Sequence, residues 1–593
     1  MQFRLFKMRL RRQFKSQRKQ VVGFGHQAEQ QFDQHVFKKV GRIARVRRFV
    51  IGWIGLLILL MIGVALQTFH LASYYQTVQP VDGGIYREGI LGTFTTANPL
   101  YATTQVDTSV SRLVFSGLLQ YNEKNQLIGD LAQGFSVDTR GTTYTVTLKP
   151  NLTWQDGAPV TSKDVVYTYG AIQNPDAQSP LLSSWQGIIV TAVDDHTVTF
   201  KLPRPLASFA NNLTNGILPE HILGKTAAVD LRTSDFNTVK PIGTGPFKLN
   251  ALEVDNADPK TAQEQLAFVP FGGYVGGKPR LDQFIIAAYS NQDQLISSFR
   301  HGQLTALAGL SSEPAEIKDM PNAQAHNMLL TAGTYVFLKN SSPLLGSAKL
   351  RQALERSTDQ AKVIDKLAYP TRPVRAPLLK DQPAYDVNFL QPPPDAKIAA
   401  QLFDADGWTL GKDGLRMKDG KPLKFNLVAA DLPEYATVGR ELQTQWKKVG
   451  VTVELRLLDP QDFQTALSFH DYDALLYGIS LGTDPDVFVY WDSTQADIRS
   501  ANRLNLSEYK SAVADEALES GRTRLDPTLR NIKYKAFLQA WEQDAPAIGL
   551  YQPRTLYITN GTVTGLTNNT INTGTDRYKN VQNWQIRQAR VTN

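Results

Sequence analysis

Residues 435–458 read YATVGRELQTQWKKVGVTVELRLL, and this stretch decides the fold class. Leucine and tryptophan side chains recur on one face of residues 435–449, which predicts an amphipathic helix. Gly450 follows as the residue that ends the helix, because glycine adopts the conformation of a helix C-terminus without strain. Residues 451–458 (VTVELRLL) then predict a strand. A helix–glycine–strand unit of this kind is typical of α/β proteins.

Similar elements recur elsewhere in the chain. Residues 142–149 (TTYTVTLK) and 195–202 (DHTVTFKL) alternate with a period of two and predict strands, and residues 349–367 predict a helix. The chain has 593 residues, enough for about three or four compact units. A composition with 42% apolar and 20% charged residues is that of a globular protein and not of a disordered chain.

The net charge of +8 is concentrated at one end. Residues 1–48 carry 14 Lys or Arg against two acids, whereas the remaining residues have a net charge of −4. The basic tail therefore argues against a nucleic-acid-binding surface on the rest of the protein. Phe3, Phe6, Leu10 and Phe14 recur at helical spacing within the tail, so it either lies on an anionic membrane surface or forms a solvated basic arm.

An apolar run follows the tail directly. Residues 49–66 read FVIGWIGLLILLMIGVAL, and the uncharged stretch continues through residue 69. A run of this length covers roughly 27 Å as a helix, which is close to the thickness of a bilayer core. Because basic residues precede it, we expect a single membrane helix at 49–69 with the N-terminus in the cytoplasm. A cleaved signal peptide is the alternative, but the preceding region is long and no polar stretch precedes the candidate cleavage site.

Each candidate catalytic, metal or cofactor motif in the sequence lacks a residue that its chemistry requires. Gly478-Ile479-Ser480-Leu481-Gly482 has the spacing of a serine nucleophile elbow, but the last histidine, His470, precedes the serine. Residues 272–278 (GGYVGGK) have the spacing of a phosphate loop, but Pro279 follows where Ser or Thr is needed. The eight histidines form no zinc motif, and the chain has no cysteine to hold zinc, act as nucleophile or carry a lipid anchor. We therefore expect a protein that is not an enzyme and needs no cofactor or metal.

The order of short motifs over residues 84–586 resembles a known family. The motifs are NPLY (98–101), LVFSGLL (113–119), YTVTLK (144–149), WQDGAPVT (154–161), DVVY (164–167), ILPEHIL (217–223), IGTGPF (242–247), GYVGGKPRLD (273–282), LRQAL (350–354), DPD (484–486) and YKNVQNW (578–584). Together they resemble the extracytoplasmic solute-binding proteins of ABC importers, family 5, which includes the oligopeptide-, dipeptide- and nickel-binding proteins. The stretch from 144 to 167 is the most specific match.

The resemblance implies an α/β, two-lobed type II periplasmic-binding-protein fold with an extra subdomain, here preceded by one membrane helix. The implied ranges are a cytoplasmic tail (1–48), the membrane helix (49–69), a tether (70–83), lobe I (84–122 with 238–333 and 553–586), the extra subdomain (123–237), lobe II (334–552) and a C-terminal tail (587–593). Two crossing segments form the hinge between the lobes.

The resemblance also implies where a solute lies. Thr103, Thr104 and Gln105 correspond to the strand that pairs with a peptide backbone in the family. Leu481 stands where the family carries an aspartate for the peptide ammonium, and Phe337 lies near another charged anchor. The remaining cleft residues implied by the family are Tyr435, Tyr477, Gly478, Thr483 and Asp484. Because an unpaired buried ammonium costs several kcal/mol, short zwitterionic peptides suit this arrangement less well than longer peptides, neutral or aromatic solutes, or sugar oligomers.

We therefore expect a monomeric receptor that traps a peptide or similar oligomeric solute between two lobes and delivers it to an ABC permease and ATPase complex. The receptor is expected at the cell membrane, with its binding domain periplasmic or on the cell surface. A sensory or adhesive binding module with the same fold is the alternative, and the basic tail is its best support.

Overall fold

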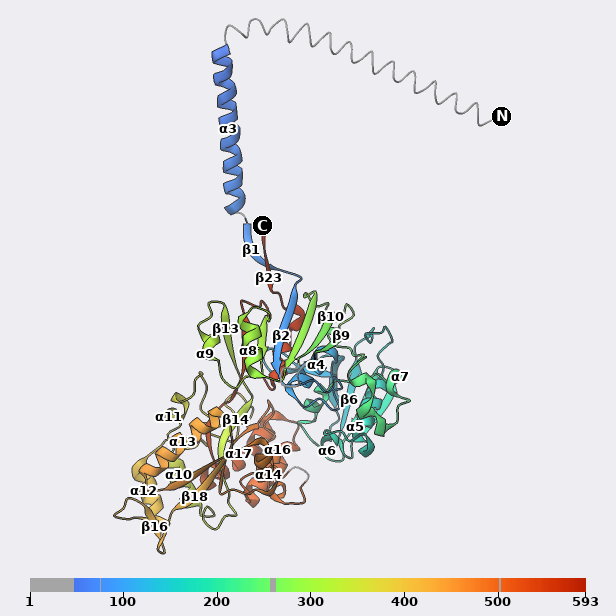
Figure 1. The fold of residues 1–593 in the computed structure, drawn as a ribbon. Helices are drawn as coiled ribbons and strands as arrows, with labels where there is room; N and C mark the ends of the chain where they lie inside the picture. The colour runs from blue at the N-terminus through green and yellow to red at the C-terminus, as the bar shows by residue number, and fades with distance from the viewer. Residues whose placement is uncertain (1–46, 75, 256–262, 501–502, 593) are drawn as a thin grey trace. The chain divides into compact units, whose positions relative to one another are not determined.

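The computed structural model describes residues 47–592 except residue 75, residues 256–262 and residues 501–502 (Figure 1). The chain divides into two units, one containing the segments up to Gln79 and from Gln588, and one from Pro80 to Arg587. The sequence pattern of the basic tail, from Phe3 to Phe14, lies outside the described residues.

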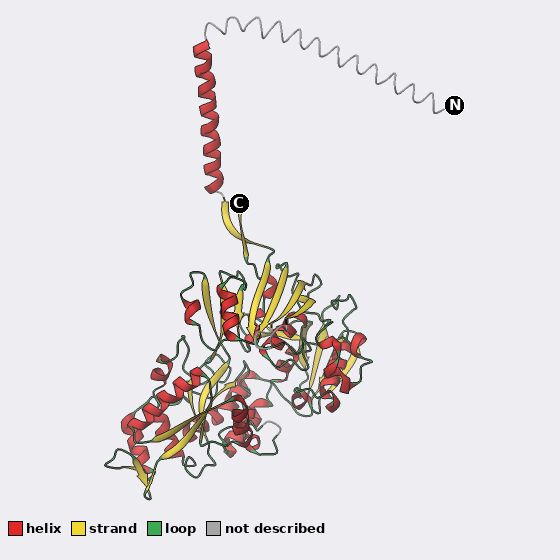
Figure 2. Ribbon diagram, viewed as in Figure 1, coloured by secondary structure: helices red, strands yellow, loops and turns green. Residues whose placement is uncertain are grey.

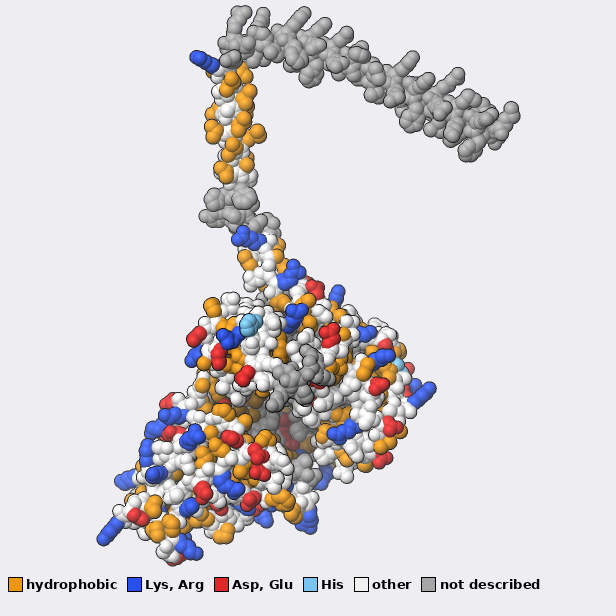
Figure 3. Space-filling view, viewed as in Figure 1, with side chains coloured by type: hydrophobic (Ala, Val, Ile, Leu, Met, Phe, Trp, Pro, Cys, Tyr) orange, Lys and Arg blue, Asp and Glu red, His pale blue; other side chains and the backbone are white. Residues whose placement is uncertain are grey.

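A long helix, α3 (Arg47–Tyr74), opens the described chain. Its window from Arg48 to Thr68 is long and apolar enough to cross a membrane, and none of this window is buried in the protein. Figure 3 shows the helix covered by apolar side chains, whereas charged side chains of both signs are scattered over the rest of the visible surface. The apolar run is thus a helix, as expected, and the helix continues beyond residue 69.

The predicted tether (70–83) and C-terminal tail (587–593) are not free connectors. Helix α3 continues through Tyr74, and β1 (Gln76–Val81) pairs with β23 (Arg587–Thr592) in a two-stranded sheet. Pairing satisfies the backbone hydrogen-bonding groups of both segments, which a lone extended strand would leave to water. The sequence pattern did not predict this pairing, because each strand's partner lies at the opposite end of the chain.

The first lobe, as we name the part built on the largest sheet, contains a mixed seven-stranded sheet in the order β13-β22-β12-β2-β11-β10-β9. Its strands are β2 (Ile85–Leu91), β9 (Phe247–Asp255), β10 (Gln263–Pro270), β11 (Gln283–Tyr289), β12 (Ala306–Ala308), β13 (Ala323–Leu329) and β22 (Arg554–Asn560). Its helices include α4 (Gln105–Val114), α8 (Gln292–Arg300) and α9 (Ala315–Lys318). Strand β2 lies at the centre and runs parallel to both of its neighbours.

A buried ion pair ties a late segment of the chain to β2. Glu88 Oε1 accepts hydrogen bonds from Arg577 Nη2 at 2.5 Å and from the Tyr578 hydroxyl at 2.7 Å, and Oε2 accepts from the Tyr557 hydroxyl at 2.7 Å. The Glu88 and Arg577 side chains are 0% and 1% exposed. Because both carboxylate oxygens accept hydrogen bonds and Arg577 supplies the opposite charge, the pair can be buried without an unpaired charge.

The subdomain, residues 123–237, contains an antiparallel four-stranded sheet in the order β5-β6-β8-β7. Its strands are β5 (Ala132–Val137), β6 (Thr143–Leu148), β7 (Ile189–Asp194) and β8 (Thr197–Lys201), and its helices include α5 (Ser162–Gln173), α6 (Leu182–Trp185), η3 (Phe209–Thr214) and α7 (Glu220–Leu223). The strands predicted at 142–149 and 195–202 are confirmed as β6 and β8. The small sheet of β3 (Leu119–Tyr121) and β4 (Leu127–Gly129) leads into the subdomain.

The WQDGAPVT motif builds this subdomain and joins it to the first lobe. Trp154 is fully buried, and Thr161 with Asp164 forms a capping box at the start of α5. The Gln155 amide donates hydrogen bonds to the Val114, Gly245 and Phe247 carbonyls and accepts one from the Gly243 N–H. The most specific sequence motif therefore has a structural role.

The second lobe is a mixed sheet in the order β19-β18-β20-β14-β21 with helices packed against it (Figure 2). Its strands are β14 (Ala332–Leu338), β18 (Lys424–Ala430), β19 (Thr452–Leu458), β20 (Ala474–Ser480) and β21 (Ala547–Tyr551), and its helices include α10 (Ala348–Arg356), α11 (Gln360–Asp365), α12 (Ala396–Ala405), α13 (Pro433–Lys448), α14 (Pro460–Phe469), α15 (Phe488–Trp491), η6 (Ser493–Ala496), α16 (Ala512–Arg522) and α17 (Pro527–Asp544).

The stretch that opened the sequence argument folds as predicted. Helix α13 is followed by Gly450, which has a φ of +87°, and then by β19. The helix predicted over 349–367 is instead two helices, α10 and α11. Asp359 interrupts it because its side chain accepts a hydrogen bond from the Lys362 N–H and caps α11.

Two segments connect the lobes, and they lie side by side. The Leu330 N–H donates to the Pro553 carbonyl at 2.8 Å, and the Gln552 side chain donates to the Leu330 carbonyl at 2.8 Å. One segment leads from β13 to β14 and the other from β21 to β22. These two segments are the candidates for the hinge that the sequence resemblance implied.

Candidate functional site

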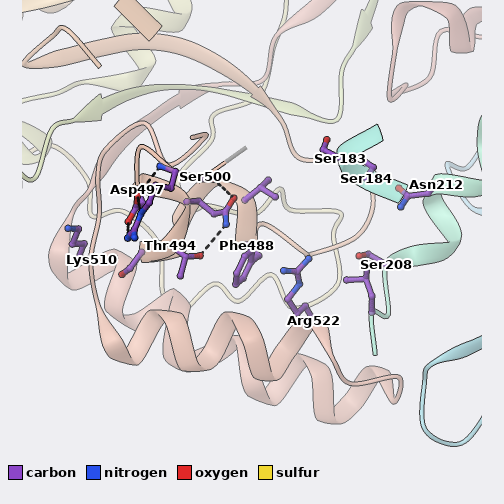
Figure 4. Close-up of a pocket in the computed structure, with 15 residues that line it drawn as sticks. Ser183, Ser184, Ser208, Asn212, Phe488, Thr494, Asp497, Ser500, Lys510 and Arg522 are labelled. Carbon is purple, nitrogen blue, oxygen red and sulfur yellow. Dashed lines mark hydrogen bonds and ion pairs between the residues drawn. The ribbon is translucent and has the colours of Figure 1, made fainter. Parts of the chain in front are cut away.

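A polar hollow of about 1010 Å³, which we call the polar chamber, lies where the subdomain faces the second lobe. Its subdomain wall comes from α6, the loop before η3 and η3 itself, and its second-lobe wall comes from α15, η6, α16 and the intervening loops (Figure 4). The lining residues are Ser183, Ser184, Leu206, Ser208, Asn212, Phe488, Val489, Ser493, Thr494, Gln495, Asp497, Arg499, Ser500, Lys510 and Arg522. An adjoining hollow of about 940 Å³ shares Ser183, Ser184 and Arg522 with it.

Charged side chains at the polar chamber are mostly paired within the protein. Arg522 Nη2 lies 3.4 Å from Asp486 Oδ2, and its guanidinium stacks 4.1 Å from the centroid of the Phe488 ring. Asp497 accepts hydrogen bonds from Arg499, and this contact holds the pKa of Asp497 well below its usual range. The positive charge at the chamber is only partly compensated, because Lys510 is exposed and the buried Arg522 Nε has no hydrogen-bond partner among the described residues.

Asp484, one of the residues implied by the family, is committed to an internal ion pair. Arg530 of α17 donates to both Asp484 oxygens, at 2.6 and 2.5 Å, and the Asp486 N–H donates to Asp484 Oδ1 at 2.9 Å. Burial works against the charged guanidinium, but the hydrogen bond and charge of Asp484 outweigh it and raise the pKa of Arg530. Asp484 therefore has little capacity left for a solute ammonium.

The neighbouring residues connect the second lobe to the subdomain and the first lobe. Asp486 accepts a hydrogen bond from the Ser208 hydroxyl at 2.8 Å. The Tyr121 hydroxyl of β3 donates to Asn211 at 3.0 Å, and burial raises the pKa of Tyr121, while Thr483 acts in the opposite direction. The TDPD segment (483–486) thus braces the subdomain against the second lobe.

Thr103, Thr104 and Gln105 are not a strand. Thr104 is the N-cap of α4, where its hydroxyl accepts a hydrogen bond from the Asp107 N–H at 3.1 Å, and Gln105 is the first residue of the helix. Threonine followed by an acidic first turn favours a helix start, so this segment is not the strand that the resemblance implied. Thr103 and Thr104 are nevertheless exposed.

Tyr435, Tyr477 and Gly478 come together in the second lobe. Tyr477 and Gly478 lie on β20, and a Cβ atom at Gly478 would stand 3.2 Å from the Tyr435 hydroxyl of α13. The centroid of the Tyr477 ring lies 5.7 Å from that of the Phe463 ring. Burial raises the pKa of Tyr435 and of Tyr477. The absence of a side chain at Gly478 keeps room for the Tyr435 hydroxyl.

Phe337 and Leu481 are core residues. Phe337 is 0% exposed and its ring lies 5.7 Å from the Trp491 ring, and Leu481 is 5% exposed. Neither lines the polar chamber. The chamber residues themselves were not singled out from the sequence, because they come from short helices and loops whose spacing carries no pattern. Thr483 and Asp484 stood closest to them in the chain.

In the described part of the chain, no group of three or more His, Cys, Asp or Glu side chains could hold a metal ion.

Comparisons with known proteins agree on one family. The model of the bacterial extracellular solute-binding proteins, family 5, matches residues 126–500. The oligopeptide-binding protein AppA of Bacillus subtilis is 26% identical over 492 residues, covering 80% of this chain and 87% of AppA. The probable D,D-dipeptide-binding periplasmic protein DdpA of Escherichia coli is 25% identical over 470 residues, covering 77% of this chain and 86% of DdpA.

Solved structures show the same fold. The structure of AppA from Bacillus subtilis in complex with a nonapeptide has a TM-score of 0.68 at 24% identity and covers 86% of this chain and 100% of AppA. NikZ from Campylobacter jejuni in complex with Ni(L-His) has a TM-score of 0.70 at 24% identity and covers 85% of this chain and 99% of NikZ. These relatives are solute-binding proteins, which are not enzymes. The chain belongs to the bacterial extracellular solute-binding proteins of family 5.

Proposed function

We propose that this protein is a membrane-anchored receptor that traps a peptide or similar oligomeric solute between its lobes and delivers it to an ABC import permease and its ATPase. The observation that carries the proposal is the polar chamber of about 1010 Å³ between the subdomain and the second lobe, together with the two adjacent segments that connect the lobes. A cleft between parts joined by a hinge is the usual build of a solute receptor that closes on its ligand. The names of the relatives, which include oligopeptide- and dipeptide-binding proteins, support a peptide as the first solute to test.

The solute path would include residues implied by the family as well as the chamber. Thr103 and Thr104 are exposed at the start of α4, and Tyr435 and Tyr477 supply a tyrosine pair beside Gly478. In this arrangement Thr483 and Asp484 hold the walls in place through Tyr121 and Arg530.

Helix α3 would anchor the receptor, with the basic tail in the cytoplasm and the lobes outside. Its apolar window from Arg48 to Thr68 and the arginines before it support this orientation. The chain has no native cysteine, so one introduced cysteine is the only labelling site.

Uptake and topology test the two parts of the proposal. Deletion of the gene is expected to abolish import of at least one peptide or oligomeric solute, and the full chain is expected to restore it. A Val78→Cys variant is expected to react with a membrane-impermeant maleimide in intact cells, because Val78 is 60% exposed, whereas a Ser16→Cys variant should react only after lysis. Unchanged uptake would refute the transport role, and release of a soluble form lacking α3 would refute the anchor.

A further inference from the structure

The segment that leads from β13 to β14 is hydrogen-bonded on both sides. On one side the Leu330 N–H donates to the Pro553 carbonyl of the other connecting segment at 2.8 Å. On the other side Ile571 donates its N–H to the Leu329 carbonyl at 2.9 Å and accepts a hydrogen bond from the Thr331 N–H at 2.8 Å. Ile571 is 3% exposed and belongs to the hydrophobic core of the first lobe and the subdomain. The peptide unit that ends at the Thr331 nitrogen is therefore fixed to the first lobe.

The carbonyl of Thr331 is fixed to the second lobe. It accepts hydrogen bonds from the Leu481 N–H at 2.9 Å and from the Gly482 N–H at 3.0 Å, just after β20. Because each peptide unit is planar, only φ and ψ of Thr331 lie between a peptide fixed to one lobe and a peptide fixed to the other. Thr331 is therefore the residue at which this segment passes from the first lobe to the second.

The loop held by this carbonyl reaches the polar chamber. We call residues 481–486 the chamber loop. The Gln382 amide donates to three of its carbonyls at 3.0 to 3.2 Å. At the end of the loop, Asp486 accepts a hydrogen bond from the Ser208 hydroxyl of the subdomain at 2.8 Å and lies 3.4 Å from Arg522, which lines the chamber. A rotation at the start of the chamber loop therefore reaches the wall of the chamber.

The other connecting segment changes lobes at a proline. The Gln552 N–H donates to the Arg372 carbonyl at 2.9 Å, and the Gln552 carbonyl accepts a hydrogen bond from the Thr371 hydroxyl, so this residue is fixed to the second lobe. The next carbonyl, that of Pro553, accepts the Leu330 N–H. The proline ring holds φ at about −65°, which leaves ψ as the free dihedral angle at this position.

A side-chain hydrogen bond restrains Thr331. Its hydroxyl donates to Asn572 Oδ1 at 2.7 Å, and Thr331 is 7% exposed. Within the described part of the chain, the Asn572 side chain has no second hydrogen bond, because its Nδ2 atom is buried without a partner. The Asn572 N–H donates to Asp576 Oδ2 at 2.9 Å, which holds the backbone of Asn572 in place. Because a β-branched side chain has few χ1 rotamers, fixing the hydroxyl also restrains the backbone of Thr331.

We propose that the lobes close by turning about Thr331 and Pro553, and that the hydrogen bond from Thr331 to Asn572 sets the angle between them. This inference rests on the proposed receptor function and adds the residues on which closure depends. Hinge motion is generally absorbed by a few dihedral angles at the ends of elements. Here a turn at the two residues moves Asp486 relative to Ser208, and so opens or closes the wall of the polar chamber.

The distance between the subdomain and the second lobe tests the inference. Cysteines introduced at the exposed residues Val193 and Leu529 of the full chain, in lipid nanodiscs, carry spin labels for double electron–electron resonance without any solute. Thr331→Val keeps the shape of the side chain but removes its hydroxyl, so the distance distribution should become about twofold wider or more. Thr331→Ser keeps the hydroxyl and should retain the original distribution.

A second variant and two controls complete the test. Pro553→Ala frees φ in the other connecting segment and should also widen the distribution. Thr465→Val is the matched control, because Thr465 is exposed on α14 and its hydroxyl donates to the Gln461 carbonyl of the same helix. It should leave the distribution unchanged. Labels at Val193 and Asn250, in the subdomain and the first lobe, should keep their distance in every variant.

The other outcomes separate this inference from the proposed function. If either Thr331→Val or Pro553→Ala leaves the distribution between Val193 and Leu529 unchanged, the inference is wrong, while the receptor function stands if deletion of the gene abolishes uptake. If the labels at Val193 and Asn250 spread equally, Thr331 holds the fold together and is not a pivot, and the inference is again wrong. If the distribution widens as expected but deletion leaves uptake intact, the pivot stands and the proposed function is wrong.

Discussion

The subdomain contacts the two lobes through faces of different chemistry. Toward the first lobe it shares one hydrophobic core, which joins Tyr144 and Trp154 of the subdomain to Tyr86 and Phe284 of the large sheet. Toward the second lobe it makes polar contacts: the Ala207 N–H donates to the Arg522 carbonyl, the Ser208 hydroxyl donates to Asp486, and Arg204 pairs with Glu519 at 3.7 Å. The two core clusters of the second lobe contain no described subdomain residue.

The difference shows which interface can open. Separating a shared core exposes apolar surface to water at a large free-energy cost, whereas surface hydrogen bonds and ion pairs exchange for water at little net cost. The subdomain is therefore expected to move with the first lobe. The polar chamber lies at the interface that is expected to open.

The largest effect is expected when the Gln155 hydrogen bonds between the subdomain and the first lobe are removed. A Gln155→Leu change leaves the carbonyls of Val114, Gly245 and Phe247 and the Gly243 N–H without this partner in a buried place. Unsatisfied buried groups of this kind should lower the free energy of unfolding by about 3 kcal/mol. Urea denaturation measures the loss, and Gln133→Leu, at an exposed position, is the matched control. A loss as small as that of the control would show that the Gln155 amide does not hold the interface.

Alkaline pH should weaken the second lobe alone. Glu355 on α10 is 1% exposed, and burial, with the charge of Glu542 adding to it, raises its pKa to about 8. The folded protein keeps this proton where the unfolded chain, with a pKa of about 4.3, has lost it, so stability falls as the pH rises toward 8. Between pH 6 and pH 8 the loss should be about 2–3 kcal/mol, and Glu355→Gln should remove most of it.

Hydrogen exchange distinguishes a local effect from a global one. Amides of β14 and β20 in the second lobe should lose protection at the higher pH, while those of β6 and β8 in the subdomain keep theirs. Glu316→Gln, at an exposed site in the first lobe, is the control for removing a carboxylate. An equal loss of protection from hydrogen exchange in β6 and β14 would mean that the subdomain and the second lobe unfold together. That result would contradict the view that the interface between them is the weaker one.

The sequence predicted the fold more completely than the site. Helix α13, Gly450 and β19 follow from apolar periodicity and one glycine, because those signals are local. The pairing of β1 with β23 and the break at Asp359 were missed, since the first depends on a distant partner and the second on one side-chain hydrogen bond. Asp484 was selected from the sequence as a cleft residue, but its carboxylate faces Arg530, a contact that depends on how α17 packs.

The change with the smallest effect on the free energy of unfolding should have the largest effect on how far the subdomain separates from the second lobe. Arg204→Ala with Ser208→Ala removes an exposed ion pair and one hydrogen bond of the second interface, so the free energy of unfolding should fall by only about 1 kcal/mol. The open form should nevertheless become more populated. Cysteines introduced at Val193 and Leu529, which are 62% and 54% exposed, carry spin labels whose distance reports the separation of the subdomain from the second lobe.

As the control, a second pair of labels at Val193 and Asn250 measures the distance between the subdomain and the first lobe. This distance should not change in the Arg204→Ala, Ser208→Ala variant, because a shared hydrophobic core holds the two parts together. If both label pairs broaden alike, the subdomain moves independently of the first lobe and the shared core does not make them one body. If neither label distance changes while Gln155→Leu still destabilises the protein, Arg204 and Ser208 do not hold the subdomain against the second lobe. The hydrogen bond from the Ala207 N–H to the Arg522 carbonyl would then be the next contact to test.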